Sequence, residues 1–326
     1  MEFDFKNEFE SMMKSNELDT VVVLGHINPD GDAAGSVMGI AHYIGVNYPE
    51  YQVFPYLADT IDKGPKLQVR QDKKFDPFEK PDLQGKRFAT VICDTATLAR
   101  LSGREFYEAS VASIVIDHHA SNEGYGDRNY TKVSEACAVN VFYSLNQDDL
   151  KKAAEAEEYP NAADYIYLGI VHDTGVFQYS STKPSTMEAG AELLRKGIDG
   201  PKIIEKTFFE KTYAQNQVLG KALLESIRLM DGKVIFSYIT KKSMSFFGVK
   251  AKDLEGIVSQ LRVTAGVEVA IFLYELESGE FKVSLRSKEK VDVSKVARYF
   301  GGGGHVRAAG LTFRGTVYDA VNNLMN

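Results

Sequence analysis

The chain has 326 residues, an apolar fraction of 44%, a charged fraction of 25% and a net charge of −7. This length favours two domains over one core, and the composition is that of an ordinary globular protein. The negative charge excludes a protein that wraps long duplex nucleic acid, which needs a broad basic surface. Short anionic substrates remain open, because bound divalent metals and a few local cations can reverse the field inside a cleft.

The sequence also argues against a membrane span and a disulfide framework. No run approaches eighteen consecutive apolar residues, and the N-terminal MEFDFKNEFE is acidic where a secretory signal would be basic and then apolar. We therefore expect a cytoplasmic protein with no membrane partner. Cys93 and Cys137 lie far apart without a metal-type spacing, so we expect both to be small buried apolar side chains.

In the first part of the chain, short apolar runs alternate with helix-like segments. Val- and Ile-rich runs at residues 20–25, 51–57, 87–94 and 113–119 are typical of strands buried on both faces of a parallel sheet. Between the first two runs, AAGSVMGIAHYIG has the apolar spacing of a helix. This alternation predicts an α/β domain over residues 1–198.

The pattern changes from about residue 199. Residues 200–230 have the pattern of one long helical stretch, or two with a break, without a strand signal, and we predict a helical linker over 199–230. Residues 231–326 mix strand and helix patterns and predict a smaller α+β domain. It includes a hairpin whose turn is Ser278-Gly279.

Polar side chains with metal-binding chemistry follow the predicted strands of the first domain. Ligands of an open parallel sheet bind beyond the carboxyl ends of its strands, so such residues can meet although they are far apart in sequence. The residues at these predicted strand ends are His26, Asp30, Asp32, Asp94, Asp117, His118, His119 and Asp173.

Imidazole nitrogens with several carboxylate oxygens suit Mn²⁺, Mg²⁺ or a similar ion, and the lack of thiolates argues against structural zinc. The candidates exceed what one ion needs, which indicates a pair of ions acting on a phosphoryl centre.

Each piece alone also has an ordinary interpretation. DGD and DTG are common turns, and DHH could be an internally satisfied cluster. We expect His42 to be a partly buried helix residue and not a ligand. His172 would point away from Asp173 in an extended segment, so we leave it out of the site.

Taken together and in order, HINPDGD, CDTA, DHHASN and HDTG resemble the four metal-binding motifs of the DHH phosphoesterase superfamily, which includes RecJ exonuclease, nano-RNases and family II pyrophosphatases. FGGGGHVRAAG at 300–310 resembles the glycine-rich signature of the DHH-associated (DHHA1) substrate domain. This second signature and the chain length are similar to the NrnA-like group of nano-RNases and pAp phosphatases.

The resemblance implies two Mn²⁺ ions, with Mg²⁺ or Co²⁺ as alternatives. His26 and Asp30 would hold one ion and Asp32 and His118 the other. Asp94 and Asp173 would bridge both ions.

Two further residues of the first domain would act beside the ions. Asp117 would orient an imidazole. His119 would face the scissile phosphate and stabilise its developing charge.

The second domain would hold the substrate. An arginine at a strand end can bind a phosphate bidentately, and glycines let the backbone approach an anion closely. The residues implied for this role are Arg286, Ser287, Gly302, Gly303, Gly304 and His305, with Arg262 and Arg307 as weaker candidates. The alternative is that GGGG forms only a flexible turn.

The resemblance implies hydrolysis of short oligoribonucleotides to mononucleotides, of pAp to AMP and phosphate, or both, by attack of a metal-activated hydroxide on phosphorus. The substrate, short single-stranded RNA or a nucleotide phosphate, would lie in a cleft between the domains. Alternatives are a phosphodiesterase for linear or cyclic dinucleotides of the pApA type, an exopolyphosphatase, and a non-catalytic nucleotide sensor.

A dinucleotide-binding oxidoreductase is disfavoured, because the glycine run follows a helix instead of opening one. A homodimer is left open. The loop 59–80, which is mixed in charge, receives no role from these patterns.

Overall fold

The computed structural model describes residues 3–59, 61, 63–156 and 159–325. The chain forms two compact units, the first ending at Glu210 and the second beginning at Lys211. The segment 199–230, expected as a linker, is divided between them. The first unit contains α9 (Gly200–Ile204) and the π-helical turn η2 (Glu205–Phe209), and the second contains α10 (Tyr213–Leu224) and β6 (Ile227–Leu229).

The absence of a strand in that segment was a wrong expectation, because β6 is three residues long, too short to leave an alternation pattern. Within the described ranges, the structure contains no helix with the length and apolarity needed to cross a membrane.

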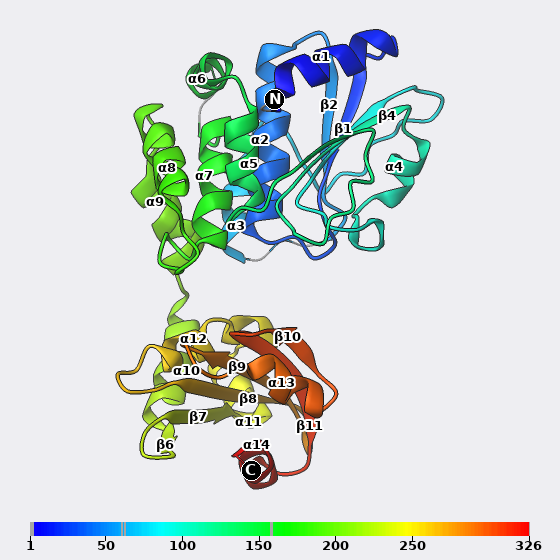
Figure 1. The fold of residues 1–326 in the computed structure, drawn as a ribbon. Helices are drawn as coiled ribbons and strands as arrows, with labels where there is room; N and C mark the ends of the chain where they lie inside the picture. The colour runs from blue at the N-terminus through cyan, green and yellow to red at the C-terminus, as the bar shows by residue number, and fades with distance from the viewer. Residues whose placement is uncertain (1–2, 60, 62, 157–158, 326) are drawn as a thin grey trace. The chain divides into compact units, whose positions relative to one another are not determined.

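The first unit is built on a parallel sheet with strand order β2-β1-β3-β4-β5 (Figure 1). Its strands are β1 (Thr20–Leu24), β2 (Gln52–Tyr56), β3 (Ala89–Cys93), β4 (Ala112–Asp117) and β5 (Arg128–Thr131). The predicted parallel α/β class is confirmed. The edge strand β5 was not predicted, because its sequence RNYT is half exposed and has no apolar run.

The central strands are apolar throughout because both faces of the sheet are covered. Along β1, Val21 and Val23 face a core shared with α2, whereas Val22 and Leu24 face a second core that contains Phe106. The helices around the sheet are α1 (Phe5–Ser15), α2 (Gly31–Asn47), α3 (Lys63–Val69), α4 (Arg104–Ala109), α5 (Cys137–Ser144), α6 (Gln147–Ala156), α7 (Ala162–Asp173) and α8 (Pro184–Arg195), with a 3₁₀ turn at Leu98–Arg100. As predicted, Cys93 and Cys137 are buried free thiols.

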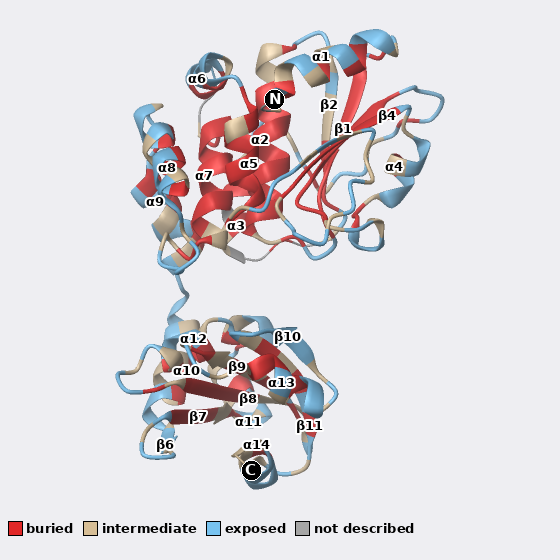
Figure 2. Cartoon of the chain, in the orientation of Figure 1, coloured by how far each residue is buried: buried red, intermediate tan, exposed pale blue. Residues whose placement is uncertain are grey.

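Helix α7 corrects the expectation that LGIVHDTG follows a strand. The helix starts with a capping box between Asn161 and Asp164 and continues to Asp173. It is buried nearly all round, as Figure 2 shows for α2, α5 and α7, so an apolar stripe with helical period is not visible in its sequence. Asp173 therefore reaches the site from the last turn of a helix.

Helices α2 and α7 are in backbone contact. A Cβ atom added at Gly35 of α2 would lie 2.5 Å from the carbonyl oxygen of Tyr165 and 2.7 Å from the backbone nitrogen of Gly169, both in α7. Glycine is therefore required at position 35 for the two helices to approach this closely.

A buried polar cluster ties the loop after α3 to these helices. His42 of α2 contacts Asp72 at 2.6 Å and stacks on Tyr165, whose hydroxyl donates to the same carboxylate at 2.8 Å. His42 is thus a buried helix residue, as expected. Burial opposes ionisation of Asp72, but the hydrogen bonds from His42, the Phe75 amide and Tyr165 outweigh it and hold the pKa of Asp72 below its ordinary value.

We expect Asp72→Asn to reduce the free energy of unfolding by about 2–4 kcal/mol at pH 7, because the Asp72 side chain is 1% exposed and its loss leaves buried polar groups mismatched. Because the pKa of Asp72 is lower in the folded than in the unfolded protein, ionised Asp72 stabilises the fold at pH values above its unfolded pKa of about 4. This stabilisation is lost as the pH falls through the pKa of Asp72 in the folded protein. The difference between wild type and variant in urea denaturation should therefore shrink below about pH 4. A constant difference from pH 7 to pH 3 would contradict the ionised role. Asp82→Asn, at an exposed residue, is the control.

The second unit contains a mixed sheet with strand order β10-β11-β9-β8-β7-β6, in which β7 and β8 run parallel. Its other strands are β7 (Val234–Ile239), β8 (Val269–Glu277), β9 (Glu280–Ser287), β10 (Gly303–His305) and β11 (Ala308–Arg314). Its other helices are α11 (Lys241–Phe247), α12 (Ile257–Arg262), α13 (Val293–Tyr299) and α14 (Val317–Met325), with a 3₁₀ turn at Ala251–Leu254. The predicted hairpin is present, with Gly279 at φ 74° in its turn between β8 and β9.

The glycine run is not simply a loop. Its last residues form β10, which pairs antiparallel with β11. A Cβ at Gly302 would lie 2.2 Å from the carbonyl oxygen of Gly310, and one at Gly304 would lie 2.5 Å from that of Ala308. The absence of a side chain at these two positions therefore allows the backbone of the glycine run to lie close to the backbone of β11.

Candidate metal centre

The first motif places three candidate ligands at the junction of β1 and α2. His26 follows the strand, and Asp30 is the N-cap of α2, where its carboxylate accepts hydrogen bonds from the amides of Asp32 and Ala33. Pro29 directly precedes this N-cap, and Gly31 is the first residue of the helix. His26 and Asp32 are buried, at 7% and 0% exposure.

Asp94, which follows β3, stands between two imidazoles. Its Oδ2 lies 3.4 Å from Nε2 of His26, and its Oδ1 lies 3.2 Å from Nε2 of His118, which follows β4. One carboxylate thus faces two separate nitrogen donors with its two oxygens. This is the arrangement that a carboxylate needs to bridge two cations.

The remaining candidates divide into groups around these two histidines. The ligand atoms of His26, Asp30 and Asp94 lie within 4.8 Å of one another, and so do those of Asp32, His118 and Asp173. The structure therefore brings all six predicted ligands together. Asp173 lies with the second group, and its bridging of both ions stays a prediction.

Backbone contacts fix which nitrogen of each histidine faces the centre. His26 Nδ1 donates to the carbonyl of Ile27 at 2.8 Å, and His118 Nδ1 donates to that of Ser134 at 3.2 Å. Nε2 of each ring therefore faces the carboxylates and is the atom that would bind a metal, as in other metal sites where the second ring nitrogen is held by a backbone carbonyl.

Asp32 is positioned by a helix far along the chain. Its Oδ2 accepts from the Cys137 amide at 2.5 Å and its Oδ1 from the Ala138 amide at 2.9 Å, at the start of α5. The N-terminal amides of a helix stabilise a carboxylate. The sequence analysis missed this contact, because nothing in residues 134–138 shows which side chain caps α5.

The electrostatics of the cluster follow from its crowding. Burial disfavours charge on the imidazoles, but the hydrogen bonds with neighbouring carboxylates outweigh it and raise the pKa of both His26 and His118 to about 10. Burial opposes ionisation of Asp94, yet the same two imidazoles lower its pKa. Burial and the charges of Asp30 and Asp94 raise the pKa of Asp173 to about 7. Positive charge bound among these carboxylates, such as that of metal ions, would therefore stabilise their ionised forms.

The donor set fits divalent cations. Asp94 Oδ1 is buried, and although His118 Nε2 lies 3.2 Å away, no well-aligned hydrogen bond reaches this oxygen from the described residues. Such an atom is costly unless something else binds it. The six ligand residues offer oxygen and imidazole nitrogen only, which suits Mn²⁺ or Mg²⁺. The residues present therefore fit a pair of such ions.

His119 lies beside this cluster and is held by Asp117. His119 Nδ1 contacts Asp117 Oδ1 at 2.9 Å, and the other oxygen of Asp117 accepts from Asn122 Nδ2 at 2.7 Å. Asp117 is fully buried, whereas the His119 side chain is 43% exposed. Nδ1 of this partly exposed ring is thus held by Asp117. Asn122, which lies in DHHASN, was not singled out from the sequence.

The same geometry allows a second set of metal ligands, because one ligand atom each from Asp94, Asp117, His118 and His119 also lies within 4.8 Å of the others.

We expect Asp117→Asn to lower kcat about 10- to 100-fold with Mn²⁺ affinity unchanged, because His119 would lose its orientation. Calorimetric Mn²⁺ titration and the His119 ring-nitrogen NMR shifts check this. An equal loss of Mn²⁺ binding would make Asp117 a ligand. Asp127→Asn, away from the cluster, is the control.

His172 is close to the first motif although it was left out of the site. A Cβ at Gly31 would lie 2.3 Å from His172 Cγ, so Gly31 is needed for α7 to approach the start of α2. His172 Nε2 lies 3.1 Å from the Thr207 hydroxyl of η2. Burial lowers the pKa of His172 to about 4. His172 is a neutral packing residue between the first motif and η2.

The residues expected to hold substrate lie in the second unit. Arg286 is partly exposed near the end of β9, and Arg262 ends α12. Ser287 is 1% exposed and donates to the Val291 carbonyl at 2.6 Å, which gives it a structural role. Arg307 donates to the carbonyls of Glu289 and Val291. Gly303 and His305 are exposed on β10.

The chain thus combines a parallel sheet, with this ligand cluster at its carboxyl edge, and a mixed-sheet second unit, and family models for two-domain phosphoesterases match both parts. Residues 20–170 match the DHH family N-terminal domain, and residues 231–326 match the DHHA1 domain. The chain therefore contains a DHH N-terminal domain followed by a DHHA1 domain.

Similar proteins cover almost the whole chain. The bifunctional oligoribonuclease and PAP phosphatase NrnA of Bacillus subtilis (strain 168) is 26% identical over 90% of this chain and 88% of its own length. The probable bifunctional oligoribonuclease and PAP phosphatase NrnA of Streptococcus mutans is 28% identical, over 96% and 97%. The crystal structure of an exopolyphosphatase-related protein from Bacteroides fragilis superposes with a TM-score of 0.81 at 25% identity, over 98% of this chain and 95% of that one.

Proposed function

We propose that this protein is a Mn²⁺-dependent phosphoesterase with two ions that converts short oligoribonucleotides to mononucleotides and pAp to AMP and phosphate. The observation that carries the proposal is Asp94, whose two oxygens face His26 and His118 at 3.4 and 3.2 Å. The relatives named as oligoribonuclease and PAP phosphatase support the choice of substrate, because the similarity spans both domains.

The chain's own residues would divide the chemical work. The ligands of the candidate metal centre are His26, Asp30, Asp32, Asp94, His118 and Asp173. Bound ions would supply Lewis acidity and a deprotonated water. The Ile27 and Ser134 carbonyls keep the rings of His26 and His118 oriented, and the α5 amides hold the Asp32 carboxyl group in place.

His119 would bind a non-bridging oxygen of the scissile phosphate through its Nε2. Asp117 holds the ring by its other nitrogen and would stabilise the positive charge that a phosphate contact favours. In this assignment His119 is a catalytic residue and Asp117 a positioning residue.

The DHHA1 domain would hold the other end of the substrate. We assign this role to Arg286, with Gly303 and His305 on the edge strand β10, which β11 separates from β9, and with Arg262 as an additional cation. Ser287, Gly302 and Gly304 are not included, because their side chain or backbone is already used within the domain. We propose that the enzyme acts in the cytoplasm.

A substrate panel tests the function. Purified enzyme with Mn²⁺ is given RNA dimers to pentamers, pAp, pApA, cyclic dinucleotides, polyphosphate and pyrophosphate, and product release is followed by chromatography and phosphate assay. We expect turnover of short RNA and pAp, and its loss in EDTA. Turnover of none of the nucleotides would overturn the proposal.

Exopolyphosphatase is a second candidate, favoured by the similarity to the exopolyphosphatase-related protein of Bacteroides fragilis, which extends over both domains. In the same panel this function predicts phosphate release from polyphosphate with a kcat/KM above that for pAp and RNA. A kcat/KM for polyphosphate below those for pAp and RNA would exclude the exopolyphosphatase function.

A further inference from the structure

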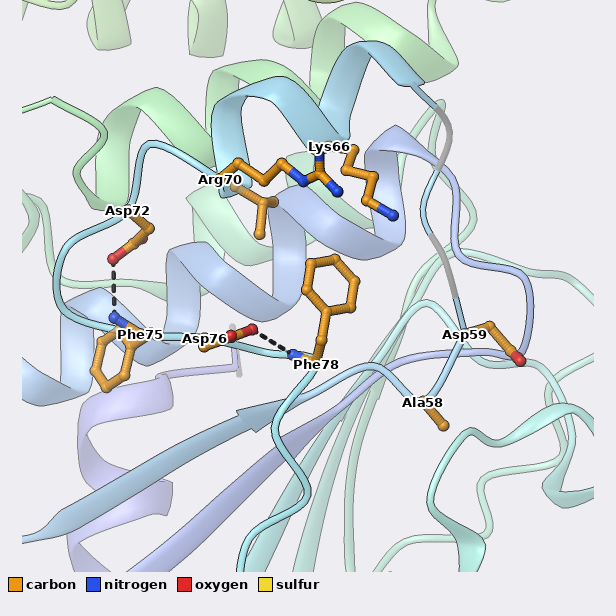
Figure 3. Close-up of a pocket in the computed structure, with 9 residues that line it drawn as sticks. Ala58, Asp59, Lys66, Arg70, Asp72, Phe75, Asp76 and Phe78 are labelled. Atoms are coloured by element: carbon orange, nitrogen blue, oxygen red, sulfur yellow. Dashed lines mark hydrogen bonds between the residues drawn. The ribbon is translucent and has the colours of Figure 1, made fainter. Parts of the chain in front are cut away.

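A hollow of about 510 Å³ lies at the carboxyl end of β2, in the first unit. It is bounded by Ala58 and Asp59 after the strand, by α3, and by the loop that follows α3 (Figure 3). Its volume is in the range of small-molecule sites, about 300–1,000 Å³. The carboxyl edge of a parallel sheet is also where ligands bind, and β2 is the neighbour of β1, which leads to His26.

Two cations reach the hollow from one face of α3. Lys66 and Arg70 are four residues apart, so their side chains are neighbours on the helix surface, and both extend toward the same space in Figure 3. Lys66 Nζ lies over the ring of Phe78, 5.3 Å from its centroid. Among the residues that the structure describes, neither cation is paired with a carboxylate.

The acidic residues around the hollow are already engaged by other groups. Asp72 accepts from His42, Tyr165 and the amides of Lys74 and Phe75. Asp76 accepts from the amide of Phe78 at 2.9 Å. These carboxylates are therefore held by their own loop and by α2 and α7, and in the described part of the chain neither is paired with Lys66 or Arg70.

The rim of the hollow is connected directly to the first metal-binding motif. Asp59 Oδ2 accepts from the amide of Asn28 at 3.0 Å, two residues after His26. The Ala58 amide donates to the Ser102 hydroxyl, and the Ser102 amide donates to the carbonyl of Gly25. A ligand in the hollow would therefore lie beside the loop that carries His26 and Asp30.

We propose that this hollow is a subsite for the nucleotide next to the scissile phosphate of an oligoribonucleotide. Lys66 and Arg70 bind the phosphate of that nucleotide, and the rings of Phe75 and Phe78 form the apolar wall against its base or ribose. The proposal rests on the proposed function and deepens it, because the subsite serves substrates longer than pAp. It also gives the loop 59–80 a role.

The test is the double variant Lys66→Ala/Arg70→Ala. The ratio of kcat/KM for an RNA trinucleotide to that for pAp should fall at least about tenfold relative to wild type, mainly through KM, because charge-assisted contacts to the chain phosphate are lost. The control is Lys151→Ala/Lys152→Ala, which removes the same charge from the exposed surface of α6. In the control this ratio should stay within twofold of wild type.

A binding measurement separates this proposal from the proposed function. Fluorescence polarisation of a labelled RNA trinucleotide in EDTA should show at least about tenfold weaker binding to the Lys66/Arg70 variant than to wild type and the control. If the Lys66/Arg70 variant binds the trinucleotide more weakly but the wild-type protein hydrolyses no nucleotide, the proposed function is wrong and the subsite is supported. Unchanged trinucleotide binding, or equal losses for trinucleotide and pAp in a variant with wild-type thermal stability, would overturn the subsite.

Discussion

The Asp94→Ala variant should lose hydrolysis of every substrate and the binding of both metal ions. Asp94 is the residue whose oxygens face both His26 and His118, so its removal takes one ligand from each candidate ion position. We expect kcat/KM to fall more than about a thousandfold, well beyond the 10- to 100-fold typical of an outer hydrogen-bonding partner. Calorimetric titration with Mn²⁺ and single-turnover kinetics with pAp measure the two losses.

Two further variants make the Asp94 result specific. Asp148→Ala removes an exposed carboxylate at the start of α6 and should retain two bound ions and full activity. Asp173→Ala should weaken mainly the ion held with Asp32 and His118, because its carboxylate is grouped with them. An Asp94→Ala protein that still binds two Mn²⁺ with wild-type affinity would refute the shared position of this carboxylate.

Gly35→Ala should destabilise the first unit by about 3 kcal/mol or more, at the upper end of the range for overpacked cores. The added Cβ would meet the Tyr165 carbonyl at 2.5 Å and the Gly169 amide nitrogen at 2.7 Å. Both are backbone atoms of a buried helix, so no side-chain rotation relieves the contact. Thermal unfolding followed by circular dichroism measures the loss.

The effect should extend to the metal centre, because α2 carries Asp32 and α7 ends at Asp173. Mn²⁺ affinity of the folded Gly35→Ala protein should therefore fall as well. Gly220→Ala is the matched control, because Gly220 lies inside α10 and nothing is within 4 Å of the added Cβ. We expect this substitution to increase the free energy of unfolding by about 0.5–1 kcal/mol. A Gly35→Ala protein with wild-type stability would show that α2 and α7 can separate without cost.

The central strands of the first sheet and the convergence of the candidate ligand residues at its edge were the predictable part of this protein. β1, β3 and β4 are buried on both faces, and such strands leave continuous Val/Ile runs whose ends mark the carboxyl edge of the sheet. Short elements with half-exposed sequences, such as β5 and β6, leave no such run. Helix α7 was assigned to the wrong class because complete burial removes the amphipathic period that distinguishes a helix from a strand.

Contacts between distant segments could not be predicted. The amides of Cys137 and Ala138 reach Asp32 over more than a hundred residues, and the Asp59–Asn28 contact joins two loops. Neither depends on a local pattern. The glycine run was predicted to bind substrate, and only the structure shows that Gly302 and Gly304 lie against the backbone of β11.

The dependence of Asp32 on α5 sets the order in which the centre can be assembled during synthesis. A growing chain that has reached Thr131 already contains every strand of the first sheet and five of the six ligands, all except Asp173. It lacks the two amides that fix Asp32 and the helix that delivers Asp173. A partly synthesised chain therefore cannot present the complete ligand set, and the centre becomes competent only when the final helices of the first unit close over the sheet.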